Sequence, residues 1–478
     1  MFPAGKAYHA RMMDISAVKR GVSSLILMEN AAFSLYLEVV KVIEHFKPEK
    51  IVAFAGRGGN GGDSFALLRI LKDRGCDIPM FIMPLFDEKD LLGDSFLNWK
   101  ILPGSIETIT ADQIKGKILF IDGMIGTGLK SDLSGKIKDA VAFISGYKEK
   151  FVVSIDVPTG LNSDNGKIMG EAVKADITVT LGMYKTGLFA EKGPFMCGKI
   201  ILGHISANNG DIPKTGYFVE DSLFPEPVNI PVDSYKNKCG HLLIIGGDVE
   251  KLGATIIAAR SFMASGGGLV TAAFRKDIHL QVAGVMPGMM LADIDDVTDR
   301  LNDFDSIIIG PGLSKWPFKS YDVFKNYKGS IIADAGMFDL VSDKIAASLK
   351  NCKVVFTPHP GELKRFLDAG SKESWIEQVE RFPLEKNHVL VAKSHAPFIK
   401  FPEKTVIVPH GAKALSFGGT GDALTGVLAF ETFFNGLNAG VVRAVLRHRL
   451  AGVELEKKNC ASFHDIDSLI NIIGNTGD

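Results

Sequence analysis

The sequence has few cysteines, no excess of either charge and no long apolar run, and each absence excludes a class of protein. The five cysteines, Cys76, Cys197, Cys239, Cys352 and Cys460, are scattered and form no CxxC pair, which argues against a disulfide framework and a zinc site. Lys plus Arg number 54 and Asp plus Glu 55, so no basic excess favours nucleic acid or an anionic membrane as a partner. We therefore expect a protein of the reducing cytoplasm.

No uninterrupted apolar run reaches the ~18 residues of a membrane span, and residues 1–10 lack the apolar core of a signal peptide. The run 423–442 comes nearest, but Glu431, Asn435 and Asn438 interrupt it, so we predict a buried helix there. We expect a soluble homo-oligomer that binds neither nucleic acid nor membrane.

Short apolar runs alternate with helix-like segments, which is typical of a mostly parallel sheet with helical crossovers. The chain has 478 residues, 46% of them hydrophobic and 23% charged, and is long enough for two large α/β domains. The predicted strands are 51–55, 79–83, 117–121, 151–155, 177–181, 241–245, 269–273, 306–309, 330–333, 353–356 and 388–392, with a hairpin of 398–401 and 405–408. Helices are predicted at 16–42 and 64–72.

This rhythm breaks at 209–238, where Pro213, Pro225, Pro227 and Pro231 lie close together. Such a segment is typical of a linker between domains. We place the boundary near Asp221, which gives an N-terminal domain of residues 1–220 and a C-terminal domain of residues 221–478.

A glycine-rich stretch, Gly56-Arg-Gly-Gly-Asn-Gly-Gly-Asp63, follows the first predicted strand. Its glycines let backbone N–H groups approach an anion. It matches GxGxxG only weakly as a dinucleotide motif, because the acidic partner Asp87 comes late. Asp122 and Asp156 each follow another predicted strand, at the carboxyl ends where open α/β sheets bind ligands. The pattern predicts a ligand site in the first domain.

A second glycine-rich stretch, Ser416-Phe-Gly-Gly-Thr-Gly-Asp-Ala-Leu-Thr-Gly426, precedes an apolar helix-like run. Gly418, Gly419 and Gly421 would expose backbone amides at a helix N-terminus, and Asp422 could take a proton from a hydroxyl. This arrangement suits phosphoryl chemistry, although the chain has no GxxxxGK[ST] sequence. The alternative is structural, with the glycines forming a tight turn and Asp422 capping the helix.

Three further stretches accompany the first loop: Met28-Glu-Asn-Ala-Ala32, Ile121-Asp-Gly-Met-Ile-Gly-Thr-Gly-Leu129 and Ser154-Ile-Asp-Val-Pro-Thr-Gly-Leu161. Together they resemble the epimerase domain of the NAD(P)H-hydrate repair family over about the first 205 residues. The resemblance implies a Rossmann-like, three-layer α/β fold.

The resemblance also implies site residues for the first domain. The hydrated dinucleotide would contact Gly59, Asn60, Gly61, Gly62, Asp63, Gly126, Thr127, Gly128, Leu129, Lys130, Ser131, Asp132 and Asp156. Potassium would bind Asn60, Asp122 and Thr159, and oxygen ligands suit such a hard cation. Our hypothesis makes Asp156 the acid and base that removes the hydroxyl from one face of the ring and returns it to the other. The alternative is that the Asp156 carboxylate caps a helix or a turn.

The second domain carries Cys239-Gly-His-Leu-Leu-Ile-Ile-Gly-Gly247, Gly253-Ala254, Gly310-Pro-Gly-Leu313, Ala333-Asp-Ala335 and Thr357-Pro-His-Pro-Gly-Glu362 in order. These motifs resemble the ribokinase-like NAD(P)H-hydrate dehydratase domain, which implies a second three-layer α/β fold. The residues implied to contact the hydrate are Ala254, Gly312, His359 and Asp422. Those implied to contact the nucleotide are Lys393, Ser394, His395, Ala396, Pro397 and Gly421.

The combined expectation is a bifunctional repair enzyme that interconverts the R and S hydrates of NADH or NADPH and dehydrates the S form. ADP would be the phosphate donor, with ATP as the alternative and Mg²⁺ as its companion. Asp422 would be the catalytic base of dehydration. Ser394 and Pro397 stand where the family usually has glycine and threonine.

Other interpretations of the sequence stay open. The second domain could be a ribokinase-like kinase that releases a phosphorylated alcohol, beside an N-terminal nucleotide-binding module, and the first fold also occurs as a binding module in an RNA-decay scaffold. Lys185 could stabilise a phosphate or carboxylate, or be a solvated surface lysine. His359 could be a packed or surface histidine. For Asp334 we favour organising a turn or supporting a cation over acting as the base.

Overall fold

Two α/β units make up the chain, Phe2–Val219 and Glu220–Asp478, the second of which includes Met1. The structure is a computed structural model that describes residues 1–207, 211, 214–220, 238–248, 250–282, 284, 288–370, 372–409, 411–458 and 465–476. The predicted boundary at Asp221 lies outside the described residues. The predicted α/β class is confirmed for both units.

The first unit is built on a parallel sheet with the strand order β4-β3-β2-β5-β6-β7-β9. The strands are β2 (Lys50–Ala55), β3 (Met80–Pro84), β4 (Glu107–Thr108), β5 (Ile118–Gly123), β6 (Lys150–Ile155), β7 (Ile177–Leu181) and β9 (Lys199–Gly203). Beside it, β1 (Phe2–Gly5) pairs with β8 (Tyr184–Lys185) and β10 (Tyr217–Val219). The helices are α1 (Ala7–Lys19), α2 (Ser24–Phe46), α3 (Gly59–Asp73), α4 (Gly93–Lys100), α5 (Gly135–Gly146) and α6 (Gly193–Met196).

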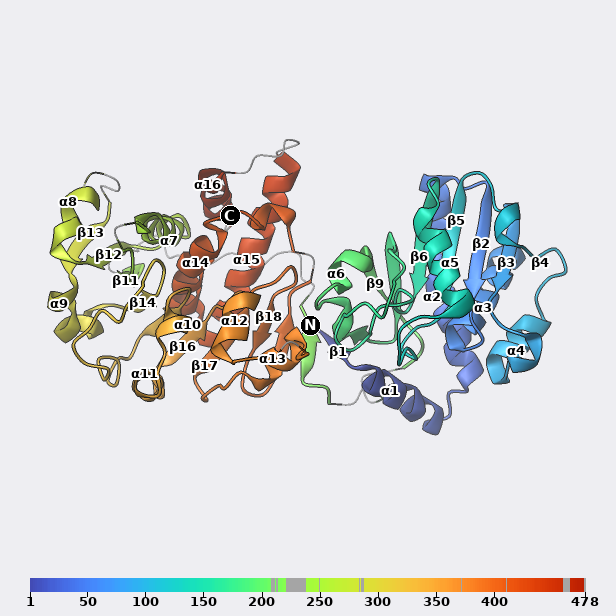
Figure 1. The fold of residues 1–478 in the computed structure, drawn as a ribbon, viewed down its shortest axis with the longest axis horizontal. Coiled ribbons are helices and arrows are strands. Elements are labelled where there is room, and N and C mark those ends of the chain that lie inside the picture. The colour runs from blue at the N-terminus through green and yellow to red at the C-terminus, as the bar shows by residue number, and fades with distance from the viewer. Residues whose placement is uncertain are drawn as a thin grey trace. The chain divides into compact units, whose positions relative to one another are not determined.

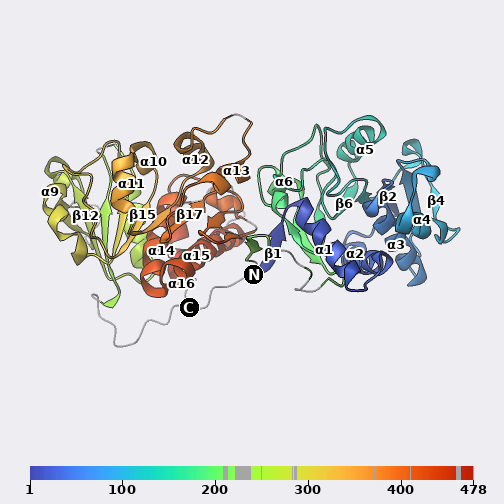
Figure 2. The same cartoon turned by 90° about the horizontal axis from the view of Figure 1, so that it is seen from below.

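Strand alternation gives this sheet two buried faces. Ile51, Ala53 and Ala55 of β2 pack with α2 and α3, whereas Val52 and Phe54 pack on the other side with α5. Figures 1 and 2 show the resulting three layers. A parallel sheet covered on both faces directs its loops, and any ligand, to the carboxyl ends of the strands.

The second unit has the strand order β13-β12-β11-β14-β15-β16-β17-β18-β19, parallel from β13 to β17 and antiparallel beyond. The strands are β11 (His241–Ile245), β12 (Leu269–Phe274), β13 (Met290–Asp293), β14 (Ser306–Ile309), β15 (Ser330–Ala333), β16 (Lys353–Phe356), β17 (His388–Ala392), β18 (Phe398–Lys400) and β19 (Thr405–Ile407). The helices are α7 (Leu252–Ala264), α8 (His279–Val282), α9 (Ile294–Val297), α10 (Met337–Leu340), α11 (Asp343–Leu349), α12 (Pro360–Phe366), α13 (Trp375–Arg381), α14 (Thr420–Asn435), α15 (Leu437–Lys458) and α16 (Ile466–Asn475).

One large apolar core joins this sheet to α7, α14, α15 and α16, with Phe262 and Phe430 among its largest buried side chains. Figure 2 shows α10 to α13 on the opposite side of the strands. Helix α14 is buried along most of its length and contacts α7 and α15. The glycine-rich stretch therefore opens a helix fixed in the core.

Two predicted helices are each broken by one glycine. The segment 16–42 forms α1 and α2, which meet at Gly21 in a left-handed conformation (φ 104°) and at Ser23, which caps α2. The segment 423–442 forms parts of α14 and α15, separated at Gly436 (φ 72°). Helix α3 begins at Gly59, five residues earlier than predicted. The predicted strands and the hairpin are confirmed.

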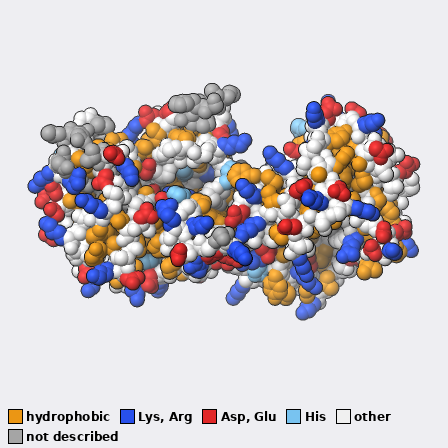
Figure 3. Space-filling view, viewed as in Figure 1, with side chains coloured by type: hydrophobic (Ala, Val, Ile, Leu, Met, Phe, Trp, Pro, Cys, Tyr) orange, Lys and Arg blue, Asp and Glu red, His pale blue; other side chains and the backbone are white. Residues whose placement is uncertain are grey.

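Basic and acidic side chains alternate over the face of each unit in Figure 3, without a basic stripe there. Within the described residues, no helix combines the length and apolarity needed to cross a membrane.

Candidate active sites

The motif residues of the first unit lie at the carboxyl ends of three neighbouring strands. Gly56 follows β2, Asp122 ends β5 and Asp156 follows β6. The strand register sets Phe54 beside Asp122 and Asp122 beside Ser154. Three loops that are far apart in sequence therefore meet at one edge of the sheet.

Backbone packing explains part of the glycine content at this edge. A Cβ added to Gly56 would lie 2.0 Å from the carbonyl oxygen of Met124, and one on Gly61 would lie 1.8 Å from that of Gly56. By contrast, a Cβ on Gly58 or Gly59 would meet nothing within 4 Å. The buried glycines let the chain segments pack closely, whereas the open ones leave room for a ligand at the start of α3.

A cavity of about 1260 Å³ lies over this edge. Among the predicted site residues, those that line it are Gly59, Asn60, Asp63, Gly126, Thr127, Gly128 and Asp156. Those that do not are Gly61, Gly62, Leu129, Lys130, Ser131, Asp132, Asp122 and Thr159. A cavity of this size accepts a ligand as large as a dinucleotide.

Asp156 is held in place by its backbone and by a buried ion pair. Its φ of 66° is left-handed, a conformation rare for residues other than glycine. Its carboxylate accepts hydrogen bonds from Lys185 Nζ and from Leu181 N at 3.0 Å. Lys185 is 1% exposed, so the interpretation of Lys185 as a solvated surface lysine is wrong.

Two further carboxyl groups line the same cavity as this ion pair. They belong to Asp14 of α1 and Asp63 of α3. Burial, and then the charges of Asp156 and Asp14, raise the pKa of Asp63 well above its ordinary value. Burial, opposed by Lys185 and reinforced by Asp156, raises the pKa of Asp14 to about 6. One lysine thus faces three carboxyl groups in this cavity.

The sequence interpretation missed Asp14, because the predicted helix began two residues beyond it. The spacing of buried Ala10, Met13 and Ala17 in α1 is the pattern that could have extended the helix upstream. Nothing in that spacing indicates that Asp14 lies near Asp156 and Lys185.

Asp122 and Thr159 lie behind the cavity wall. The Asp122 carboxylate accepts hydrogen bonds from Thr159 Oγ1 at 2.6 Å, Thr159 N at 2.9 Å and Ser154 Oγ at 2.8 Å. The side chain of Asn60 donates to the Ile155 carbonyl at 2.7 Å, and its amide group lies within 3 Å of a Cβ added to Gly126.

The oxygen atoms of this cluster are of the type that hard cations prefer as ligands. Asp122 is fully buried, and burial raises the pKa of its carboxyl although the Thr159 and Ser154 hydrogen bonds lower it. Among the described residues it has no cationic side-chain partner, and no group of three His, Cys, Asp or Glu residues is arranged to hold a metal. One carboxylate with amide and hydroxyl oxygens suits a hard cation of low charge rather than a transition metal.

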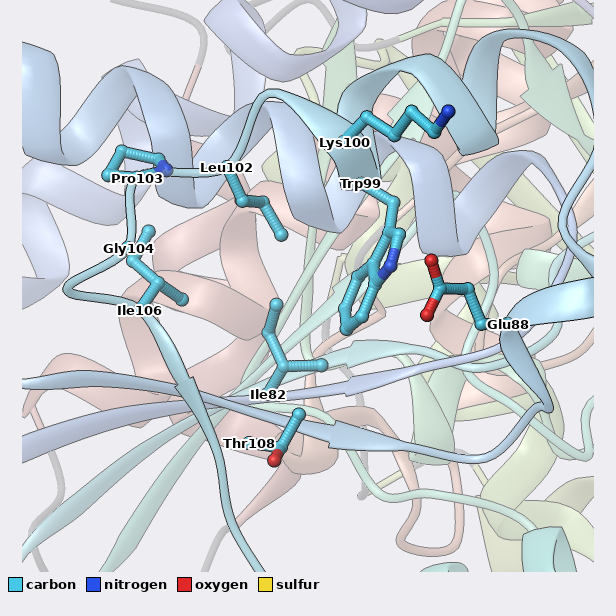
Figure 4. Close-up of a pocket in the computed structure, with 9 residues that line it drawn as sticks. All are labelled: Ile82, Glu88, Trp99, Lys100, Leu102, Pro103, Gly104, Ile106 and Thr108. Carbon is cyan, nitrogen blue, oxygen red and sulfur yellow. The ribbon is translucent and has the colours of Figure 1, made fainter.

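A second cavity, of about 350 Å³, lies beside β3 and β4 (Figure 4). Trp99 and Ile82 give it an apolar wall, and the carboxylate of Glu88 lies near the indole of Trp99. None of the predicted site residues lines this cavity.

The motif residues of the second unit also gather at strand ends. Gly247 follows β11, Gly312 follows β14, Asp334 follows β15, His359 follows β16 and Lys393 follows β17. Close backbone contacts join these loops. A Cβ on Gly246 would lie 2.2 Å from the Pro311 oxygen, and one on Gly310 would lie 1.8 Å from that of Asp334.

Asp334 accepts hydrogen bonds from two side chains at this edge. Its Oδ1 accepts from Lys393 Nζ at 2.7 Å and from Thr357 Oγ1 at 2.7 Å. The backbone N–H of Lys393 donates to the Pro358 carbonyl at 2.9 Å. Asp334 is 2% exposed, so the lysine compensates a buried charge and is fixed in one position. A Cβ on Gly421 would lie 3.4 Å from Lys393 Nζ, which places the ammonium group beside the start of α14.

Asp422 lies in the first turn of α14, where backbone N–H groups have no partner inside the helix. Gly419, the N-cap residue, is left-handed at φ 93°, a conformation that favours glycine. Among the described residues Asp422 forms no ion pair. Burial raises its pKa to about 6, with Asp334 adding to the rise, Lys393 opposing it and Glu362 contributing last. An unpaired carboxylate beside free amides can accept a proton while the amides hold an anion.

His359 has a structural role that the sequence did not indicate. Its Nδ1 accepts from Gly361 N at 3.0 Å and from Glu362 N at 3.4 Å, so its side chain caps α12. Glu362 accepts in return from His359 N at 2.9 Å. The ring is half exposed, at 53%, and its Nε2 lies 3.3 Å from Glu362 Oε1, so both ring nitrogens have partners within α12.

The remaining predicted contacts lie around the same loops. Ala254 is in the first turn of α7, and a Cβ on Gly312 (φ 70°) would lie 2.8 Å from the Lys251 oxygen. In the segment after Lys393, Ser394 Oγ donates to the Ala396 carbonyl at 2.6 Å. Ala396 is buried, and burial lowers the pKa of His395. The loop is thus closed by its own side chain.

Fold and sites define the class of protein: two α/β units, each with polar residues and glycines at the carboxyl edge of its own sheet. Residues 24–187 match the family described as YjeF-related protein N-terminus, and residues 242–475 match the family described as NAD(P)H-hydrate dehydratase. A bifunctional NAD(P)H-hydrate repair enzyme of Dictyoglomus turgidum is 30% identical over 442 residues, which is 85% of each chain. One from Moorella thermoacetica is 29% identical over 91% of this chain and 89% of its own.

The chain belongs to the family of bifunctional NAD(P)H-hydrate repair enzymes, which combine an epimerase and a dehydratase. The family and the activity expected from the sequence motifs are confirmed. Among solved structures, the ADP/ATP-dependent NAD(P)H-hydrate dehydratase of Bacillus subtilis, co-crystallised with ATP and Mg²⁺, is 24% identical. It covers 52% of this chain and 92% of its own, with a TM-score of 0.45.

Proposed function

We propose that the two reactions are divided between the two units. The unit Phe2–Val219 interconverts the R and S hydrates of NADH and NADPH, and the unit Glu220–Asp478 dehydrates the S form with ADP as phosphate donor. The observation that carries this division is that each unit has its own set of carboxylates and glycines at the carboxyl edge of its own sheet.

The dehydration chemistry follows from the poor leaving ability of hydroxide. Asp422 takes the proton of the ring hydroxyl as the hydroxyl oxygen bonds to the terminal phosphorus of ADP, and AMP leaves. The ring nitrogen's lone pair then expels phosphate, and loss of a proton from the adjacent carbon restores the reduced nicotinamide. The overall products are NAD(P)H, AMP and inorganic phosphate.

The second unit's residues support the phosphoryl step by position and charge. The amides of Thr420 and Gly421 open α14 and can bind phosphate oxygens, and Lys393 holds a positive charge beside them. Mg²⁺ would arrive with the nucleotide, since such ions bind through substrate phosphates and few carboxylates. ADP is the donor that the resemblance implies, and ATP is the competitor.

In the first unit, Asp156 with Lys185 borders the cavity that would hold the hydrate. We assign the potassium ion to the oxygens of Asn60, Asp122 and Thr159. There it would supply positive charge behind the cavity wall, close to the turn that follows β6.

The test uses the purified chain with S-NADPH hydrate and either ADP or ATP, following the recovery of reduced-nicotinamide absorbance and the nucleotide products. We expect NADPH, AMP and phosphate to form in equal amounts with ADP. Faster turnover with ATP would overturn the choice of donor. A phosphorylated hydrate that accumulates without NADPH would instead support the kinase interpretation.

A further inference from the structure

Epimerisation needs proton transfer on both faces of the nicotinamide ring. The hydroxyl leaves with a proton from one side, and water must lose a proton as it adds on the other side. A single carboxyl group fixed on one face cannot serve both, so the cavity should contain a second acid–base group.

The charged side chains that border the cavity limit the choice. From elements other than α1 these are Arg57, Asp63, Asp90, Asp94, Asp156 and Lys185. On α1 they are Arg11, Asp14 and Lys19. Electrostatic coupling joins only some of these groups: Asp14 and Asp63 each respond to Asp156 and to Lys185.

Asp63 is a poor candidate for reversible proton exchange. It is 7% exposed, and burial raises its pKa well above its ordinary value, which disfavours the ionised form. Asp156 is paired with Lys185 and accepts the N–H of Leu181. Asp14 differs from both because it lines the cavity and forms no salt bridge among the described residues.

We propose that Asp14 is the second catalytic acid–base residue of the epimerase, acting opposite Asp156. The inference rests on the proposed function of the first unit. Asp14 reaches the cavity from α1, whereas Asp156 and Lys185 reach it from the loop after β6 and from β8. A ring bound in the cavity meets carboxyl groups carried by separate elements.

The step balances without an added reagent. The protonated carboxyl group, Asp14 in one direction, gives its proton to the hydroxyl oxygen as the ring carbon–oxygen bond breaks and water leaves. The ring nitrogen's lone pair forms a double bond to that carbon. Water then adds from the other face as Asp156 takes its proton. The reverse reaction exchanges the two roles, so the active form has one proton between the two carboxyl groups.

The charge pattern supports this assignment. Two carboxylates near one ammonium group cannot both ionise freely, and the one without the direct ion pair keeps its proton to higher pH. Burial raises the pKa of Asp14 to about 6, which lets it donate and accept a proton near neutral pH.

The experiment follows epimerisation in the full chain without nucleotide, so that no hydrate is dehydrated. Pure S-NADPH hydrate is added, and appearance of the R isomer is measured by chromatography against the spontaneous rate. The variant Asp14→Asn keeps the size of the side chain. Asp139→Asn is the matched control, because Asp139 is exposed on α5 and does not line the cavity.

We expect Asp14→Asn to lower kcat for epimerisation by about 100-fold or more with little change in KM, whereas Asp139→Asn matches the wild type. The wild-type kcat/KM should also fall as pH rises through about 6, because the proton on Asp14 is lost. Asp14→Glu should show the same fall of kcat/KM with rising pH (the alkaline limb of the pH profile), but with a lower kcat/KM throughout. Thermal unfolding reports whether each variant is folded.

Wild-type kcat in Asp14→Asn, or a persisting limb near pH 6 in that variant, would overturn the role of Asp14 while leaving the epimerase assignment intact. A wild-type chain that does not exceed the spontaneous rate would overturn the proposed function itself. If Asp14→Asn is both inactive and unfolded, Asp14→Glu becomes the deciding variant. A kcat/KM in Asp14→Glu that does not fall as pH rises would contradict the proposal.

Discussion

The two units have similar arrangements of charged side chains at the carboxyl edges of their sheets. In the first, Lys185 pairs with Asp156 after β6, and Asp14 on a helix has no salt bridge among the described residues. In the second, Lys393 pairs with Asp334 after β15, and Asp422 on a helix has no salt bridge within the part of the chain that the structure describes. Burial raises the pKa of each unpaired carboxyl group to about 6.

The units differ in what surrounds the unpaired group. Asp422 stands among free backbone amides in the first turn of α14, whereas Asp14 is the eighth residue of α1, where the N–H groups bond within the helix. Amides that can hold a phosphoryl group thus lie on the same helix turn as Asp422, whereas those of the first cavity lie at the start of α3, on a different helix from Asp14. We propose that a similar pairing of lysine and carboxylate serves phosphoryl transfer in the second unit and proton transfer in the first.

The largest effect should come from Asp422→Asn. The amide cannot take the hydroxyl proton, so we expect dehydration of S-NADPH hydrate to fall by at least about 100-fold, while epimerisation without nucleotide stays at the wild-type rate. Both rates come from one preparation, and the second is the internal control for folding. Retained dehydration would remove Asp422 from the role of base.

The two lysines should differ in their contribution to stability. Lys185 is 2% exposed in its side chain and Lys393 is 21% exposed. Removing one partner of a buried pair costs about 3–5 kcal/mol, so Lys185→Met should approach that range and Lys393→Met should cost less. Urea unfolding of both variants gives the comparison. Equal losses in the free energy of unfolding would show that the greater exposure of Lys393 to solvent does not reduce the cost of removing it.

The pH dependence of dehydration should be opposite in sign to the limb assigned to Asp14. Asp422 must be ionised to act as a base, and its pKa is raised to about 6. Dehydration kcat/KM should therefore rise with pH through about 6 and fall about tenfold between pH 7 and pH 5. A flat profile over this range would contradict Asp422 as the titrating group.

A smaller effect is expected at the proposed potassium site. Asp122→Asn removes one negative charge while keeping the side chain's size, so epimerisation should need several-fold more KCl for half-maximal rate. Titration with KCl at constant ionic strength, with choline chloride as balance, measures this. An unchanged potassium response would exclude Asp122 as a ligand.

The smallest effect is expected in the nucleotide loop. Ser394→Gly removes the hydrogen bond to the Ala396 carbonyl, which contributes about 1 kcal/mol or less to holding the loop. KM for ADP should change only a few-fold, and epimerisation should not change. A loss of dehydration larger than tenfold would mean that Ser394 contacts the reacting groups.

Local patterns predicted most of the fold. The strands of both sheets show as short apolar runs because both faces of a parallel sheet are buried, and β11, β14, β15, β16 and β17 begin and end as predicted. The breaks at Gly21 and Gly436 were missed, since a single glycine inside an apolar pattern is compatible with a continuous helix.

The position of a candidate residue was predictable where the residue stands inside a local motif, and not where its position depends on packing between distant segments. Asp156 and Asp422 stand inside motifs. In contrast, Asp14 meets Lys185 only through tertiary structure, and the capping of α12 by His359 depends on its rotamer. The pairing of Asp334 with Lys393 joins residues 59 positions apart, and no local pattern specifies it.

The most direct test of the two-unit account is the conversion of pure R-NADPH hydrate to NADPH by the full chain with ADP. This conversion requires epimerisation in one unit and dehydration in the other. The account predicts that the wild-type chain forms NADPH faster than the spontaneous R-to-S rate. In Asp422→Asn it predicts that the R hydrate equilibrates with the S hydrate and that no NADPH forms. NADPH formation limited to the spontaneous rate would contradict an active epimerase in the first unit.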